Sequence, residues 1–345
     1  MVSIGLFSLM GFRDRGTPVA EVVRETVALV RQADEAGFDA AWFPEHHFSN
    51  YSICPSPLLM VSHCAGATLR IKLGPAVVVV PLYNPVRLLA EIGLVAALCG
   101  DRFQLGIGSG YQPFEFSRYG ADLAESKDRL DEFLALMDRG FGGESFTFDG
   151  RFTKVPTASF STRPTQGLPP IWIAGDSEAT HRLAARRGFT PFITGRGQGP
   201  SYLAEQRTRI EASYAKEGHA SAFRLGVLRF CCVTESRAET EAYLIAARHQ
   251  LRLASALRNQ KQDMDGGMLI ERPVDGEVTL EAMAQNLPVG DTETVTTRLI
   301  ADLKASRASH VMLNIPTLGS TMTQVQRTID VVARVIQPAL QQAIQ

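Results

Sequence analysis

Eight short apolar runs alternate with longer amphipathic stretches, and this alternation limits the chain to few folds. Short runs rich in Val, Ile, Leu and Phe are typical of strands that are buried on both faces of a sheet. The eight runs cover residues 2–8, 39–45, 71–80, 102–110, 170–175, 190–195, 224–234 and 309–316. Because a helix-like stretch follows each run, the pattern predicts a parallel sheet with helices packed on its faces.

The stretches between the runs carry apolar residues at the spacing of a helix. They predict helices over residues 18–37, 56–68, 85–100, 125–141, 177–188, 201–218, 236–257, 291–306 and 321–343. Several boundaries carry helix signals, such as Pro85 in a first turn and Gly100 just past an end. Eight strand–helix units in 345 residues fit an α/β (β/α)8 TIM barrel. We expect one domain over residues 1–345, with a doubly wound sheet as the alternative architecture.

Two segments interrupt the strand–helix rhythm. Residues 142–169 contain ESFTFDGRFTKV, which predicts a small hairpin insertion that turns at Asp149-Gly150. Residues 258–290 are rich in Gly, Pro, Asp and Met. Loops of this length in a compact domain are often functional. We therefore expect an insertion loop at the C-terminal face of the barrel, where it could act as a lid.

Composition excludes several classes of partner. The charged fraction is 21% and the formal net charge is -1, without a long basic run, so neither nucleic acid nor a membrane surface is an expected partner. The five cysteines are odd in number and form no C-x-x-C, which favours a reduced, cytoplasmic protein. No basic stretch precedes the first apolar run, so a signal peptide is not expected.

The most polar strand end is AWFPEHHFSNY, which carries Glu45, His46 and His47. Active sites of barrels lie at the C-terminal ends of the strands, so these residues are candidates for catalysis. Successive side chains of a strand point to opposite faces, so the two histidines cannot both point inward, and we assign no metal ligand. Two interpretations remain. The first is a hydrogen-bonded structural corner, and the second, which we favour, is one inward histidine that faces an organic cofactor.

Two further turns could contact such a cofactor. LGIGSGY (105–111) lacks the G-x-G-x-x-G spacing of a dinucleotide-binding turn, although its glycines could let a flat ligand approach the backbone. AGDSEATHRLAARRG (174–188) reads as a strand end and a helix start, with Asp176 or Ser177 as the N-cap. Such a helix start can hold a phosphate, but so can TLGST (317–321) after the last strand. The residues alone do not decide between these two seats.

These motifs, taken together and in this order, resemble the bacterial luciferase-like family of flavin-dependent monooxygenases. The resemblance covers nearly the whole chain. It is carried by EAGFDAAWFPEHHF, LGPAVVVVPLYNPVRLLAE, GDRFQLGIGSGYQPFEFSRYGAD, PIWIAGDSEAT and VGDTETVTTRLIADLKASRASHVMLNI. The collinear set is specific, although each motif alone is weak.

The resemblance implies a two-component monooxygenase that takes reduced FMN from a separate NAD(P)H-dependent flavin reductase. One oxygen atom of O2 is then transferred, through a flavin C4a-peroxide, to a small organic substrate. The strand ends carry Phe7, Met10, Phe12 and Trp172, which suggests that the substrate is mostly apolar. A homodimer is also implied. Hydroxylation, Baeyer–Villiger insertion and C–S cleavage all remain open.

The resemblance also assigns residues to the site. His46 is the catalytic histidine beside the flavin ring, and His47 faces away. A cis peptide beneath the ring is implied at Ala76-Val77, and Tyr111 lies in the cofactor pocket. The implied phosphate seat consists of Gly175, Asp176, Ser177 and Thr180. The resemblance therefore favours this turn over TLGST.

The chain departs from the family in the turn after its fourth strand. Many relatives have a phosphate-pairing arginine where this chain has Ser109, so flavin affinity is expected to rest on backbone donors and hydroxyls. The reactive cysteine of the light-emitting luciferases is replaced by Gly108, so light emission is not expected. Three other functions compete: a deazaflavin-dependent hydride-transfer oxidoreductase, a non-catalytic flavin-binding barrel, and a metal-dependent barrel hydrolase.

Overall fold

The computed structural model describes residues 2–165, 167–219 and 223–344. Its central sheet is parallel and has the strand order β3-β2-β1-β15-β10-β9-β8-β5-β4. The strands are β1 (Ser3–Phe7), β2 (Ala40–Phe43), β3 (Lys72–Pro75), β4 (Val78–Val79), β5 (Leu105–Gly108), β8 (Ile171–Ala174), β9 (Thr190–Thr194), β10 (Gly226–Phe230) and β15 (His310–Asn314). Each of these strands lies inside one of the eight predicted apolar runs. The run 71–80 contains two of them, β3 and β4.

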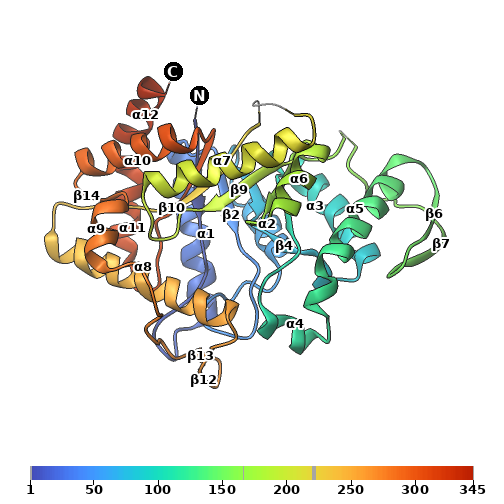
Figure 1. Ribbon diagram of the computed structural model, residues 1–345, viewed down its shortest axis with the longest axis horizontal. Helices are drawn as coiled ribbons and strands as arrows, with labels where there is room; N and C mark the ends of the chain where they lie inside the picture. Colours follow the sequence, from blue (N-terminus) through green and yellow to red (C-terminus); the bar gives the residue numbers. More distant parts are fainter. Residues whose placement is uncertain (1, 166, 220–222, 345) are drawn as a thin grey trace.

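The sheet closes on itself. Its two ends in the strand order are β3 and β4, which follow each other in the chain. The Gln104 N–H donates to the Leu73 carbonyl oxygen (2.9 Å), and Leu73 also forms a bridge with Phe103, so the β3 edge meets the start of β5. The predicted (β/α)8 barrel is therefore confirmed, and Figure 1 shows its helices arranged around the strands.

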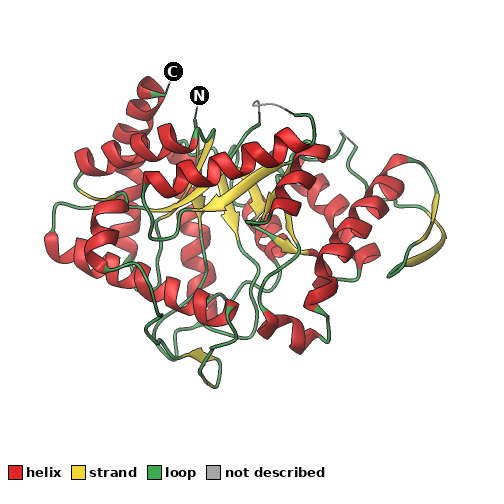
Figure 2. Cartoon of the chain, viewed as in Figure 1, coloured by secondary structure: helices red, strands yellow, loops and turns green. Residues whose placement is uncertain are grey.

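All nine predicted helices are present, with ends shifted by a few residues. Figure 2 shows the helices in red around the yellow strands. The predicted helices are α1 (Val19–Ala36), α2 (Pro57–Ala65), α3 (Pro85–Cys99), α5 (Ser126–Gly142), α6 (Glu178–Arg187), α7 (Pro200–Lys216), α8 (Arg237–Arg258), α10 (Thr292–Ser306) and the pair α11 (Met322–Val331) and α12 (Gln337–Ala343). A π-helical turn at Val332–Ile336 joins the last two. Two short helices were not predicted, α4 (Pro113–Tyr119) and α9 (Leu280–Asn286).

Two tryptophans fill the interior of the barrel. The rings of Trp42 and Trp172 meet edge to face, with centroids 4.9 Å apart. Glycines on the surrounding strands make room for them, because a Cβ at Gly5 or Gly74 would lie 2.9 or 2.7 Å from the Trp42 ring, and one at Gly226 would lie 2.8 Å from Trp172. This part of the barrel is a packed core, so space for a ligand remains only toward the C-terminal ends of the strands.

His310, at the start of β15, gives the fold a predictable sensitivity to acid. Its ring packs edge-on against Trp172 (centroids 4.6 Å apart). Burial, with the charges of Arg224 and Lys72, lowers the pKa of His310 from 6.5 to about 4. Between about pH 4 and pH 6.5, His310 is therefore protonated in the unfolded chain but not in the folded one. Its contribution to the free energy of unfolding is complete above pH 6.5 and is lost as the pH falls below that value. Between pH 7 and pH 5 this residue alone should remove about 2 kcal/mol of unfolding free energy.

Urea unfolding of the wild type and of His310→Gln at both pH values measures this contribution. The variant should lose less stability on acidification than the wild type. An equal loss in both proteins would show that other groups cause the acid sensitivity.

The two segments that interrupt the rhythm have structure of their own. Strands β6 (Phe146–Asp149) and β7 (Lys154–Ala158) form an antiparallel pair that projects from the side of the molecule (Figure 1). The segment 258–290 contains a second small pair, β12 (Met264–Asp265) and β13 (Met268–Leu269), as well as α9. Its last residues form β14 (Val289–Gly290), which pairs with β11 (Cys232–Val233).

The β12–β13 pair is fixed to the segment that follows β2. The Asn50 N–H donates to the Gly267 carbonyl oxygen (2.9 Å), and the Asn50 Oδ1 atom accepts from the Leu269 N–H (2.8 Å). This pair therefore sits at the C-terminal end of the strands, next to the histidine-containing turn. Along the described part of the chain, no helix combines the length and the apolar character needed to cross a bilayer.

Candidate active site

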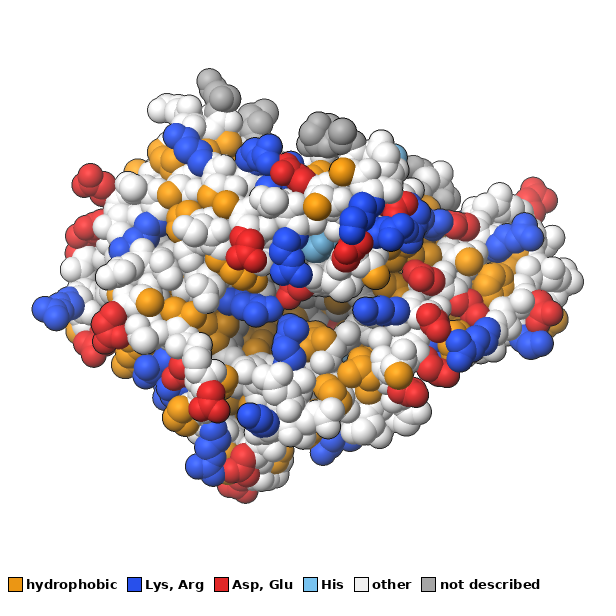
Figure 3. All heavy atoms as spheres, viewed as in Figure 1, with side chains coloured by type: hydrophobic (Ala, Val, Ile, Leu, Met, Phe, Trp, Pro, Cys, Tyr) orange, Lys and Arg blue, Asp and Glu red, His pale blue; other side chains and the backbone are white. Residues whose placement is uncertain are grey.

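A cavity of about 590 Å³ opens at the C-terminal ends of the strands. The face shown in Figure 3 is hollowed near its centre, with Lys and Arg side chains gathered around the hollow. All nine residues that the sequence assigned to the site line this one cavity: His46, Ala76, Val77, Ser109, Tyr111, Gly175, Asp176, Ser177 and Thr180. Residues far apart in the sequence are thus brought together around a single space.

Glu45 and His47 form a hydrogen-bonded corner. The Glu45 Oε1 atom lies 3.0 Å from His47 Nε2, and its Oε2 atom accepts from the Val79 N–H and the Tyr83 hydroxyl, both at 2.9 Å. The other ring nitrogen of His47 lies 2.9 Å from the Tyr119 hydroxyl. Burial raises the pKa of Glu45, although these hydrogen bonds oppose the rise. This corner ties β2 to β4 and occupies both ring nitrogens of His47.

His46 points the other way, into the cavity, as side-chain alternation along a strand requires. Its Nδ1 atom lies 3.1 Å from a carboxylate oxygen of Glu115, which also accepts from the backbone N–H of His47 (2.8 Å). A proton on Nδ1 therefore has a fixed acceptor. The Nε2 atom is then the ring nitrogen with a free lone pair on the cavity side.

The Gln112 amide lies beside the same ring nitrogen. Its terminal group is 3.1 Å from His46 Nδ1 and 3.1 Å from the Tyr111 hydroxyl, while its Oε1 atom has no partner in the described part of the chain. The opposite amide orientation presents Oε1 to the Nδ1 proton, and the two orientations differ only in the assignment of O and N. Gln112 and Glu115 together hold one tautomer of His46.

Two tyrosines flank the cavity face of His46. The ring centroid of Tyr51 lies 4.9 Å from that of His46, and the centroid of Tyr111 lies 6.1 Å away. Burial raises the pKa of both tyrosines, so their hydroxyls stay protonated at neutral pH. The guanidinium of Arg258 lies over the Tyr111 ring, 4.4 Å from its centroid. This side of the cavity is therefore rich in hydrogen-bonding groups.

The opposite side of the cavity contains the start of α6. Ser177 is the N-cap, and its Oγ atom accepts from the Thr180 N–H (3.2 Å) and lies 2.9 Å from the Thr180 hydroxyl. Gly175 has φ +150°, and a Cβ there would lie 2.9 Å from the Thr180 hydroxyl oxygen, so only glycine fits. First-turn N–H groups of a helix have no acceptor within the helix and favour an anion.

The charge of Asp176 at this helix start is balanced by Arg196, whose Nη2 atom donates to the carboxylate at 2.9 Å. Lys127, on α5, also lines the cavity near Ser109. The alternative phosphate seat TLGST lies elsewhere, because residues 317–320 line a separate cavity that does not contain His46. The turn at residues 175–180 thus shares its cavity with His46, and TLGST does not.

Some expectations from the sequence need correction. Met10 and Phe12 line the separate cavity, and Trp172 fills the barrel core, so of the four apolar strand-end residues only Phe7 faces this cavity. The peptide bond between Ala76 and Val77 is cis, as the resemblance implies. Within the described residues, no group of three His, Cys, Asp or Glu side chains is arranged to hold a metal ion.

Several lining residues were not identified from the sequence: Tyr51, Glu115, Lys127, Gln250 and Arg258. Glu115 lies on α4, a seven-residue helix whose start is marked only by Pro113. Gln250 and Arg258 lie on α8, whose sequence reads as an ordinary amphipathic helix. Their position at the cavity follows from how these helices pack, which no local pattern records.

Comparison with known proteins agrees with this geometry. The family model described as luciferase-like monooxygenase matches residues 2–310. A protein of Sinorhizobium fredii (strain NBRC 101917 / NGR234), named uncharacterized protein y4vJ, is 38% identical over 328 residues, which cover 94% of this chain and 93% of that protein. The oxygenase component of the flavin-dependent trigonelline monooxygenase of Acinetobacter baylyi is 26% identical over 286 residues, covering 80% and 79% of the two chains.

Solved structures share the fold at low identity. The oxygenating constituent of 3,6-diketocamphane monooxygenase from Pseudomonas putida, in complex with FMN, has a TM-score of 0.81 at 20% identity, over 98% of each chain. An F420-dependent secondary alcohol dehydrogenase with an F420-acetone adduct has a TM-score of 0.76 at 16% identity, over 98% of this chain and 99% of that one. The match of the family model to most of the sequence confirms the resemblance, and the chain belongs to the luciferase-like monooxygenase family.

Proposed function

We propose that the protein is the oxygenase component of a two-component monooxygenase, which binds reduced FMN and transfers one oxygen atom of O2 to a small organic substrate. The observation that carries this proposal is the single cavity with two unlike sides. One side presents His46 with its ring nitrogen fixed by Glu115, and the other presents the start of α6 with the hydroxyls of Ser177 and Thr180.

The lining residues fit a flat cofactor with a phosphate tail. Ala76, Val77 and Gly108 form a small-residue wall next to His46, and a Cβ at Gly108 would lie 2.8 Å from a Val77 methyl group. Ser109 and Lys127 line the same cavity, and they also line a second one together with Thr180 of α6. The flavin ring would rest on the wall and the phosphate would reach the helix start. When bound, reduced FMN supplies the reaction with O2.

The residues of this chain have separate tasks in such a reaction. Glu115 accepts a hydrogen bond from the Nδ1–H group of His46, which keeps the proton on Nδ1. The Nε2 atom can then accept or return a proton at the reacting face of the cavity. Leu253, Leu257 and Leu269 belong to the same buried apolar cluster as Phe7 and Leu9, which line the cavity. We expect this apolar cluster to keep water away from the reacting atoms, which limits the wasteful release of H2O2.

The partner is proposed to be a separate NAD(P)H-dependent flavin reductase. The trigonelline and diketocamphane enzymes are named as an oxygenase component and an oxygenating constituent, which supports a division of labour between two proteins. A homodimer and a cytoplasmic location remain predictions from the sequence.

Anaerobic titration of the protein with reduced FMN, reduced riboflavin and reduced F420 tests the cofactor. Reduced FMN should bind most tightly, and Lys127→Met should weaken it about fivefold without changing the affinity for riboflavin, which lacks the phosphate. Tighter binding of F420, with no product formed in the presence of O2, would support hydride transfer instead. Equal affinities for FMN and riboflavin would contradict the phosphate seat.

A further inference from the structure

Helix α8 forms part of the wall of the cavity over its second half. Leu253 and Leu257 are fully buried and belong to the same apolar cluster as Phe7 and Leu9, at the C-terminal end of the barrel. Leu251 lies near the turn after β9, because a Cβ at Gly197 would be 3.6 Å from its side chain. Arg258 is eight positions after Gln250, so about 12 Å of helix separates the two residues along α8.

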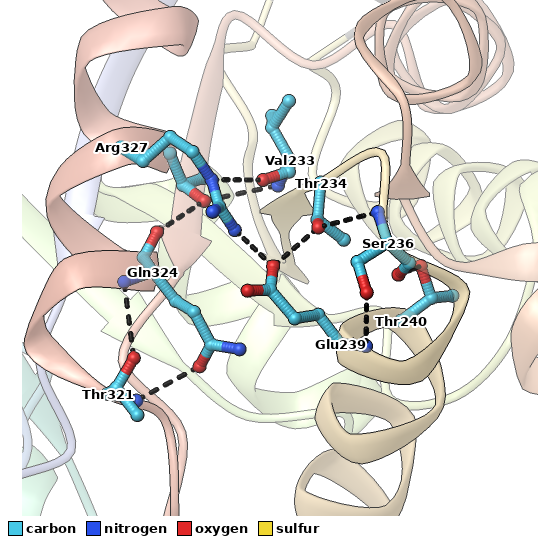
Figure 4. Close-up of polar contacts among 9 residues, drawn as sticks. Val233, Thr234, Ser236, Glu239, Thr240, Thr321, Gln324 and Arg327 are labelled. Atoms are coloured by element: carbon cyan, nitrogen blue, oxygen red, sulfur yellow. Dashed lines mark hydrogen bonds and ion pairs between the residues drawn. The ribbon is translucent and has the colours of Figure 1, made fainter.

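The N-terminal end of α8 is fixed by the network in Figure 4. Ser236 caps the helix by accepting from the Glu239 N–H (3.3 Å). The Glu239 carboxylate accepts from the Thr234 hydroxyl and forms an ion pair with Arg327 of α11. The Nε atom of Arg327 also donates to the Val233 carbonyl oxygen at 3.2 Å. This network fixes the start of α8 to β11 and α11.

The middle of α8 is fixed by a second network. Arg252 Nη1 donates to Glu271 at 2.9 Å, and its Nε atom donates to Glu277 at 2.7 Å. His249 Nδ1 lies 2.7 Å from the other carboxylate oxygen of Glu271. Gln250 is therefore placed between two anchored neighbours, and the backbone has little freedom to turn its side chain elsewhere.

The side chain of Gln250 is buried with an unpaired oxygen. The residue is 5% exposed and lines the cavity, and its Oε1 atom has no hydrogen-bond donor within the described residues. By contrast, the equally buried Gln104 accepts from the Trp172 ring N–H at 3.0 Å. A buried amide that lacks its hydrogen bonds destabilises the folded state. Such a group is explained if a ligand completes its bonds.

The other polar groups of the cavity have different tasks. Glu45 and Glu115 are engaged by the two histidines, and Asp176 is paired with Arg196. Lys127 lies by the phosphate side. Around the Gln250 side, the cavity is lined by residues with apolar surface and one hydroxyl: Phe192, Thr194 and Leu228. Strand register places Asp176 level with Thr194, but its charge is paired with Arg196, and Arg258 lies further along α8, over the Tyr111 ring.

We propose that Gln250 binds the substrate, and that the substrate is a neutral molecule with an apolar body and one hydroxyl or amide group. The amide of Gln250 can accept from and donate to such a group, while the apolar neighbours cover the rest. This inference rests on the proposed function, since the flavin is placed against the wall next to His46, which leaves the Gln250 side for the substrate.

Thermal unfolding without any ligand tests the first part of this inference. Gln250→Leu should unfold at the same temperature as the wild type or about 1–2 °C higher, because it removes an unpaired buried group. Gln104→Leu is the matched control and should unfold at a lower temperature, because it leaves the Trp172 N–H unpaired. A clear loss of stability in Gln250→Leu would overturn the proposal by showing a structural role.

Ligand binding tests the second part. Protein loaded with reduced FMN is titrated under argon with four probes of similar size: cyclohexylmethanol, cyclohexanecarboxamide, methylcyclohexane and cyclohexanecarboxylate. The alcohol or the amide should bind at least about tenfold more tightly than methylcyclohexane, and Gln250→Leu should remove this difference. Preference for the carboxylate, or no preference for a polar probe, would overturn the proposal. Failure of reduced FMN to bind the wild type would instead refute the proposed function, and the unfolding comparison would still decide the role of Gln250.

Discussion

Replacing His46 with alanine is expected to lower the rate of oxygen transfer about 10²- to 10⁴-fold, while the protein still binds reduced FMN. The variant loses the ring nitrogen that faces the cavity but keeps the hydroxyls and the helix start on the opposite side. O2 should then oxidise the flavin with release of H2O2 in place of product. Product and H2O2 measured in the same reaction give the fraction of each turnover that is productive.

Two further variants define the role of His46. His47→Ala should lower stability through the loss of its bond to Glu45, yet leave the productive fraction nearly unchanged in the protein that remains folded. Glu115→Gln should reduce the rate about tenfold and alter its pH profile, because a neutral amide oxygen accepts the hydrogen bond from Nδ1–H more weakly than a carboxylate. A His46→Ala protein that makes product at the wild-type rate would show that His46 has no part in the chemistry.

The largest loss of stability is expected from Arg229→Leu, at about 3–5 kcal/mol. Arg229 is fully buried, and its Nε atom donates to Asp302 at 2.7 Å. Its two terminal nitrogens donate to the carbonyl oxygens of Gln198 and Asn286, at 2.8 and 2.9 Å. The variant leaves a buried carboxylate and two carbonyl groups without their donor. Urea unfolding measures the loss directly.

A double variant separates the effect of the ion pair from the effect of the two hydrogen bonds that Arg229 donates to backbone carbonyl groups. Burial raises the pKa of Asp302 to about 6 despite its partner, which shows how poorly this carboxylate is solvated. Arg229→Leu combined with Asp302→Leu removes both charges, and should recover part of the stability that the single change loses. If the double variant is as unstable as Arg229→Leu, the lost bonds to Gln198 and Asn286 account for the effect, and the ion pair does not.

The strands and most helices could be predicted because their signals are local. The run 71–80 has one charged residue, Lys72, near its start and is apolar from residue 73 onward, as expected for a strand that is buried on both faces. Side-chain alternation, extended past the end of β2, likewise separated the directions of His46 and His47 before any contact was known. Local rules also placed the N-cap of α6 at one of two adjacent residues, and the structure assigns it to Ser177.

The parts that could not be predicted depend on contacts between distant residues. Glu115 lies 69 positions from His46 and belongs to a helix too short to show apolar periodicity. Gln250 is a polar residue in an amphipathic pattern, and such a pattern normally places it toward solvent. It is buried because α8 is covered on one side by the segment 259–279 and faces the cavity on the other. That arrangement is a property of the assembled barrel.

The packed tryptophan pair offers a spectroscopic reporter of the cofactor. The chain has two tryptophans, Trp42 and Trp172, and both lie in the barrel interior, in the same apolar cluster as residues that line the cavity. Oxidised flavins absorb light in the range in which tryptophan emits, so a flavin in the cavity should quench the emission of both rings by energy transfer. The intrinsic fluorescence of the unlabelled protein can therefore follow both arrival of the flavin and opening of the barrel during unfolding.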